Sequence, residues 1–67
     1  MSTQPTEYRE ALVKKVKAYM LITGIPLKNA ADYSHALSYT VKALPDVTET
    51  ARHSVASKLW REQIRKI

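Results

Sequence analysis

The chain has 67 residues with 11 Lys and Arg, 6 Asp and Glu and no cysteine, giving a formal net charge of +5. A chain this short is expected to form one domain, residues 1–67, and the lack of cysteine excludes disulfides and thiolate metal sites. The excess of positive charge favours acidic partners such as nucleic acid, an anionic membrane face or an acidic protein surface.

Two proline-containing breaks, at residues 24–26 and 44–46, divide the sequence into three stretches with apolar residues at helical spacing. The pattern predicts helices over about residues 7–23, 27–44 and 47–66. Short connections between them favour an all-α fold, a compact three-helix bundle. The single glycine argues against tight hairpins and glycine-rich phosphate loops.

The first predicted helix has one clear apolar stripe. Its members are Tyr8, Leu12, Val16, Tyr19 and Met20. Gly24 fits the left-handed position that follows a helix, where Ile25 would fold back onto Met20. Leu21 and Ile22 widen the apolar arc beyond the needs of a two-sided helix, so we expect them to contact another protein surface.

The second predicted helix has two candidate starting points. It begins either at Pro26 or with Asn29 as its N-cap, and Asp32 stands three residues on as in a capping pair. Pro45 ends it, because the residue before a proline avoids helical dihedral angles. The predicted buried stripe consists of Ala30, Tyr33, Leu37, Val41 and Leu44.

The third predicted helix follows Asp46 and Thr48, which compete as its N-cap, with Glu49 in the first turn. Its apolar face comprises Val55, Ala56, Leu59, Trp60, Gln63, Ile64 and Ile67. Its basic residues are Arg52, Lys58, Arg61, Arg65 and Lys66, which suit the negative end of the helix dipole. Ile67 either closes the core or belongs to an interface.

The residue types that carry chemistry do not form a recognisable catalytic or metal site. His35 has only Asp32 at a ligand spacing, which leaves a zinc site incomplete. Ser34–His35 and His53–Ser54 are sequence neighbours, so on a helix their side chains point about 100° apart. We therefore expect no catalytic residue, no cofactor and no metal.

Residues 31–41 resemble the spacing of a helix-turn-helix motif, with a Thr-Val pair at 40–41 opening a recognition helix. His35 stands where this motif usually has glycine, and a single continuous helix explains the stretch equally well. The DNA contacts in this alternative would come from Ser38, Tyr39, Lys42, Lys28, Arg52 and Lys58.

The Tyr-Arg-Glu sequence at residues 8–10 is followed by a helix, a glycine turn at Gly24 and two more helices. This layout, with Lys17 and Lys28 near comparable places, resembles the fumarase D family of small enterobacterial proteins. It is also similar to the Hha-like and biofilm-regulator group. The resemblance implies a small regulator that works through protein contacts. The fumarase name implies a dicarboxylate-handling activity, for which no catalytic residue can be carried over.

The sequence thus predicts a non-enzymatic regulatory or adaptor protein of bacterial or phage origin that binds another protein or a second copy of itself. Residues 1–6 lack the pattern of a signal peptide and no apolar run approaches a membrane span, so a cytoplasmic protein is expected. The alternative is a DNA-binding regulator. The candidate interface residues are Leu21, Ile22, Tyr39, Trp60, Ile64 and Ile67. The alternative role for each of them is ordinary packing in the core.

Overall fold

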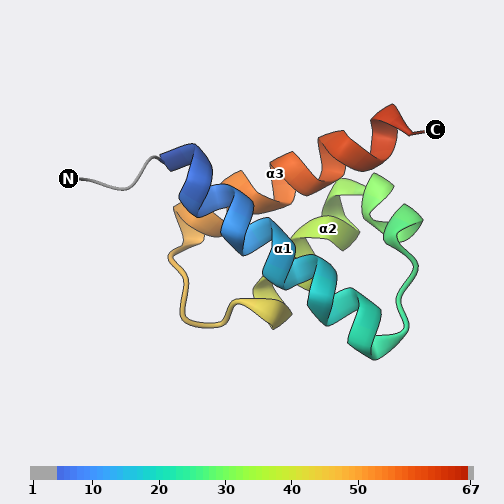
Figure 1. Cartoon of the computed structure of the whole chain (residues 1–67), viewed down its shortest axis with the longest axis horizontal. Coiled ribbons are helices and arrows are strands. Elements are labelled where there is room, and N and C mark those ends of the chain that lie inside the picture. Colours follow the sequence, from blue (N-terminus) through green and yellow to red (C-terminus); the bar gives the residue numbers. More distant parts are fainter. Residues whose placement is uncertain (1–4, 67) are drawn as a thin grey trace.

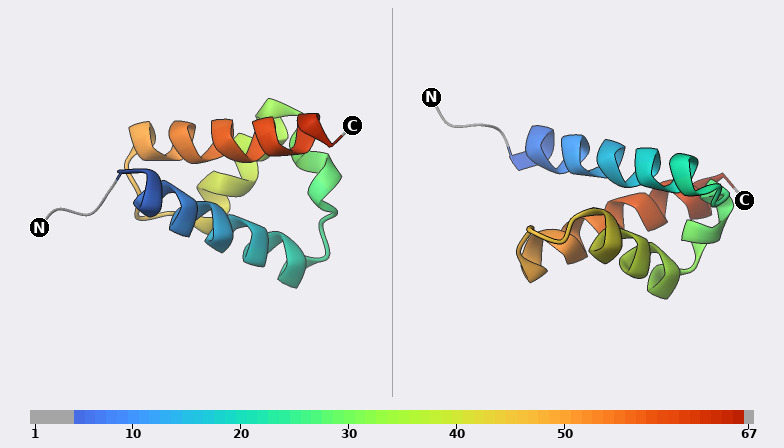
Figure 2. Two further views of the ribbon diagram at one scale, coloured as in Figure 1. Left: turned by 45° about the horizontal axis from the view of Figure 1, so that its top comes forward. Right: turned by 90° about the horizontal axis from the view of Figure 1, so that it is seen from below.

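A computed structural model describes residues 5–66, which form three α-helices and one short 3-10 helix (Figure 1). The elements are α1 (Pro5–Thr23), η1 (Leu27–Ala31), α2 (Tyr33–Ala43) and α3 (Glu49–Arg65). α1 and α3 run in the same direction, and α2 runs in the opposite sense and packs against both (Figure 2). Every pair of α-helices is in contact. The predicted all-α three-helix bundle is therefore confirmed.

The end of α1 is as predicted. Gly24 has φ 78°, in the left-handed region where a side chain is disfavoured. Its N–H donates to the Leu21 carbonyl at 3.2 Å, and the Ile25 N–H donates to the Met20 carbonyl at 2.8 Å. This is the pair of bonds that defines a Schellman motif. It turns the chain so that Ile25 packs against the core.

The predicted continuous helix over residues 27–44 is wrong, because the chain breaks at Asp32. Asp32 has extended dihedral angles, φ −98° and ψ 122°, between η1 and α2. Its Oδ1 accepts hydrogen bonds from the N–H groups of Ser34, at 2.9 Å, and His35, at 3.4 Å. The carboxylate thus satisfies two of the N–H groups that a helix start leaves free. Asp32 is the N-cap of α2, whereas Asn29 lies inside η1.

α3 begins two residues later than predicted, at Glu49. Thr48, the second of the two candidate caps, occupies the N-cap position, and its Oγ1 accepts from the Ala51 N–H at 3.3 Å. Arg52 reaches back across the α2–α3 connection and donates to the Pro45 carbonyl at 2.7 Å. The connection is therefore fixed at both ends, by a cap and by a side chain.

The core lies where α1, η1, α2 and α3 meet. Its buried apolar residues are Leu12, Val13, Val16, Met20, Ala30, Ala36, Leu44, Val55, Ala56 and Leu59. Two stripe assignments were wrong, since Tyr8 is 52% exposed and Val41 is 40% exposed. The buried face of α2 is centred one residue earlier than Val41, on Thr40, whose hydroxyl donates to the Ala36 carbonyl at 2.8 Å. That internal bond lets a polar side chain fill an apolar site.

Candidate interaction surfaces

An apolar patch lies where α1 turns into η1. Leu21 and Ile22 are 81% and 83% exposed, and Leu27 on η1 is also exposed. A shallow groove of about 330 Å³ runs beside them, lined by Lys17, Ala18, Leu21, Ile25 and Leu27. Large apolar side chains this exposed contribute nothing to the core, so the patch is the part of the described surface best suited to an apolar partner.

The other predicted interface residues have different surroundings. Tyr39 and Trp60 are half-buried against the core, and the Trp60 ring meets Tyr33 edge to face at 5.7 Å. Ile64, on α3, is exposed. Ile67 lies outside the described residues. Of the five predicted interface residues that the structure describes, only Leu21 lines the groove.

The helix-turn-helix alternative places a turn within residues 31–41, and this placement is wrong. α2 is continuous from Tyr33 to Ala43, and the ring centroids of His35 and Tyr39 lie 6.2 Å apart along it, with the rings tilted by 35°. Arg52 is engaged with main-chain carbonyls and Lys58 with Glu62. The remaining predicted DNA contacts are Lys28, on η1, and Ser38, Tyr39 and Lys42, in the interior of α2. None of them lies at the start of a helix that follows the expected turn.

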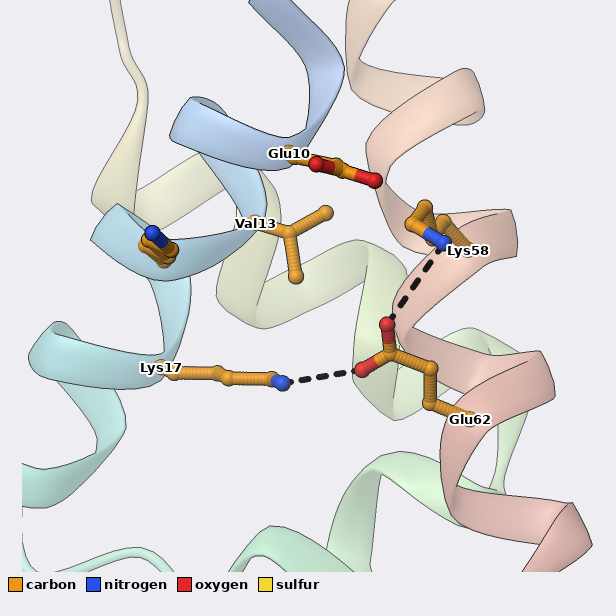
Figure 3. Close-up of a pocket in the computed structure, with 6 residues that line it drawn as sticks. Glu10, Val13, Lys17, Lys58 and Glu62 are labelled. Atoms are coloured by element: carbon orange, nitrogen blue, oxygen red, sulfur yellow. Dashed lines mark ion pairs between the residues drawn. The ribbon is translucent and has the colours of Figure 1, made fainter. Parts of the chain in front are cut away.

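A polar groove follows the line between α1 and α3. Its first part is a cavity of about 150 Å³ lined by Glu10, Val13, Lys14, Lys17, Lys58 and Glu62. Glu62 joins the two helices, because its Oε1 lies 2.8 Å from Nζ of Lys17 and its Oε2 lies 3.6 Å from Nζ of Lys58 (Figure 3). The hydrogen bond from Lys17 is the main reason that the pKa of Glu62 falls below its usual 4.5.

We expect the protein to lose stability in acid through two carboxylates. The pKa of Asp32 is lowered from 3.8, chiefly by the Ser34 hydroxyl, and the pKa of Glu62 is lowered by Lys17. A carboxyl with a lowered folded pKa stabilises the fold above its unfolded pKa, and this contribution is lost as the pH falls through the folded pKa. The melting temperature should therefore fall between about pH 5 and pH 2. Glu62→Gln should flatten part of this decline, and an unchanged pH profile for this variant would contradict the assignment.

The second part of the groove, which we name the arginine cavity, is a hollow of about 120 Å³. It is lined by Arg9, Ser57, Lys58, Arg61, Glu62 and Arg65. Ser57, Arg61 and Arg65 follow one another at four-residue steps, which places them along one face of α3, and Arg9 reaches in from α1. The two cavities share Lys58 and Glu62, so they are neighbours along the line between α1 and α3.

The arginine cavity carries more positive charge than its own acid can neutralise. Glu62 is its one carboxylate and already contacts Lys17 and Lys58. Within residues 5–66, no ion pair involves Arg9, Arg61 or Arg65. Nε of Arg9 is buried without a hydrogen-bond partner. A buried donor in this state costs about 1–3 kcal/mol. The excess of positive charge in the cavity favours an added anion.

The sequence interpretation missed the arginine cavity. Arg61 and Arg65 were explained by the dipole of the third helix, and Arg9 belonged to a separate stretch of the chain. The signal that was available is the four-residue spacing of Ser57, Arg61 and Arg65. Pairing that face with Arg9 requires knowing that α1 lies beside α3, which no local pattern reveals.

The histidines have local roles in the structure. Nδ1 of His53 lies 3.0 Å from the Tyr33 hydroxyl, and its Nε2 lies 3.8 Å from a carboxylate oxygen of Glu49.

Across residues 5–66, no three His, Cys, Asp or Glu side chains gather as a metal site. The same part of the chain has no helix with the length and apolar character to span a membrane.

Comparison with known proteins adds no family to this geometry. No protein-family model, no curated protein and no solved structure matches the chain. The resemblance to the fumarase D family and the Hha-like group therefore stays a prediction from sequence, and function is argued below from the surfaces alone.

Proposed function

We propose that this chain is a small non-enzymatic regulatory or adaptor protein that acts through helix-mediated contacts and pairs with a second copy of itself. The observation that carries the proposal is the exposure of Leu21 and Ile22 at the end of α1. A domain of this size buries only about 60% of the surface that its unfolded chain exposes. Pairing through an exposed apolar face supplies the burial that the single chain lacks.

The outward face of α1 supports self-association. We name the α1 seam for a row of exposed residues at alternating three- and four-residue steps: Tyr8, Ala11, Lys15, Ala18 and Ile22. This is the heptad spacing of helices that pack along one another, and it lies away from the buried stripe of Leu12, Val16 and Met20. α1 therefore has one row of residues for the core and a second row for another helix.

An antiparallel pairing of two seams matches large side chains to small ones. With Ala11 facing the partner's Ile22, Lys15 faces the partner's Ala18. Each of these facing pairs then joins one long side chain with one alanine, which allows the helices to approach closely. A two-fold arrangement repeats every such contact, so one seam supplies both sides of the interface. The pairing also places the two helix dipoles in opposite directions.

The experiment is sedimentation equilibrium over a range of protein concentrations for the wild type and the double variant Ala18→Gln/Ile22→Gln. We expect a dimer for the wild type and at least about tenfold weaker association for the variant. The variant removes the apolar side chain of Ile22 and replaces Ala18 with a larger residue, which keeps the two helices further apart. Both replaced residues are exposed and glutamine is a good helix former, so helix content should be unchanged.

The matched control is Val41→Gln, which replaces an exposed apolar residue on α2, away from the seam. It should dimerise like the wild type. Because α1 carries Lys14 and Lys15, two seams repel each other at low salt and dimerisation should strengthen as salt rises. A wild-type chain that stays monomeric at high concentration and moderate salt would overturn self-association, and loss of helicity in the variant would show that α1 needs these residues to fold.

A further inference from the structure

We propose that the arginine cavity binds a phosphate group carrying two negative charges, as in inorganic phosphate or a phosphate monoester. The site is distinct from the α1 seam and does not depend on self-association. It is built by Arg9 from α1 and by Ser57, Lys58, Arg61 and Arg65 from α3. The two helices run in the same direction (Figure 2), and the cavity is lined from both of them.

The charge of the cavity fits a doubly charged anion. Three arginines and one lysine face a single carboxylate, Glu62, which leaves an excess of three positive charges. Glu62 is held by Lys17 and Lys58, and these contacts keep it ionised by lowering its pKa. A ligand therefore meets the guanidinium groups of Arg9, Arg61 and Arg65, none of which forms an ion pair with a carboxylate of the described residues. A neutral or cationic ligand would leave this excess uncompensated.

The donors also fit the shape of a phosphate group. Guanidinium groups present paired N–H donors that match two oxygens of one phosphate, and several can share a tetrahedral anion. Arg9 lines the cavity and forms no ion pair within residues 5–66, so no described carboxylate competes with a phosphate for its guanidinium group. The Ser57 hydroxyl adds a neutral donor on the same side of α3. A hollow of about 120 Å³ has room for one phosphate group.

The polar cavity that adjoins it explains why the anion should select this end of the groove. There, Lys14, Lys17 and Lys58 face two carboxylates, Glu10 and Glu62, an excess of one positive charge (Figure 3). Lys58 and Glu62 line both cavities. The Lys17–Glu62 ion pair joins the two helices at this cavity. The positive excess is therefore concentrated at the arginine cavity and not spread evenly along the groove.

The test is titration with inorganic phosphate, followed by backbone and arginine side-chain NMR, at an ionic strength held constant with chloride. Saturable shifts at Arg9, Ser57, Arg61 and Arg65 are the expected result. Arg61→Gln/Arg65→Gln should weaken binding by roughly tenfold or more per arginine, because each supplies a charge-assisted hydrogen bond. The matched control, Lys28→Gln/Lys42→Gln, removes the same charge from η1 and α2 and should bind like the wild type.

Each of the other outcomes has a definite meaning. Equal shifts with chloride, or equal weakening by both double variants, would reveal general screening and overturn the site. Arg9→Lys keeps the charge but removes the planar guanidinium group, so unchanged affinity in this variant would overturn the role of Arg9. Phenyl phosphate binding like inorganic phosphate would identify a monoester terminus as a ligand. Tight binding of duplex DNA through these arginines, with no response to inorganic phosphate, would overturn the proposal in favour of a nucleic-acid backbone.

Discussion

Leu59→Ala is expected to destabilise the fold by about 2–5 kcal/mol, the usual range for truncating a fully buried leucine. Leu59 has 0% exposure on α3 and belongs to the core shared by all the helices. Domains near this size have a stability towards the low end of about 5–15 kcal/mol, so one such loss removes much of it. Urea unfolding followed by circular dichroism measures the effect.

The control for Leu59→Ala is Leu21→Ala, which truncates the same side chain where it is 81% exposed at the end of α1. It should cost well under 1 kcal/mol, because surface substitutions usually change stability by no more than about 0.5 kcal/mol. If both variants lost the same free energy of unfolding, Leu59 would not lie at the centre of the core.

Gly24→Ala is expected to cost about 1–2 kcal/mol, the penalty for placing an L side chain in the left-handed region. Gly24 has φ 78°, and a Cβ built at this position meets no atom within 4 Å. The whole cost therefore comes from the backbone and not from a clash. Each 1 kcal/mol lowers the melting temperature of a domain this small by roughly 4–8 °C, which a thermal scan resolves.

Asparagine separates the backbone effect from other consequences of the change. Gly24→Asn adds a larger side chain, yet asparagine tolerates the left-handed conformation better than alanine. It should therefore be less destabilising than Gly24→Ala. The reverse order would point to a steric effect and contradict the open space around Gly24.

The features that sequence predicted well are those with a local cause. Gly24 ends α1 because one residue type fits the required dihedral angles, and Pro45 follows α2 because it cannot continue a helix. Asp32 was identified as part of a capping pair but placed inside the helix. The sequence does not show whether its carboxylate serves the helix before it or the helix after it.

The features that sequence missed depend on neighbouring elements. Thr40 is buried in place of Val41 because α2 packs in a rotation set by α1 and α3, and hydrophobicity alone favours valine. The exposure of Leu21 and Ile22 was anticipated from the excess apolar arc. The arginine cavity was not anticipated, because its two walls are far apart along the chain.

The side-by-side packing of α1 and α3 couples binding to folding. These helices come from opposite halves of the sequence, so the groove between them exists only when the whole bundle is assembled. A ligand held there binds the native chain and has no equivalent site on an unfolded one. At a concentration one hundred times its dissociation constant, such a ligand raises the free energy of unfolding by about 2.7 kcal/mol. Occupancy of the groove would then set how long the chain survives proteolysis, giving a small domain with a thin core a lifetime governed by its ligand.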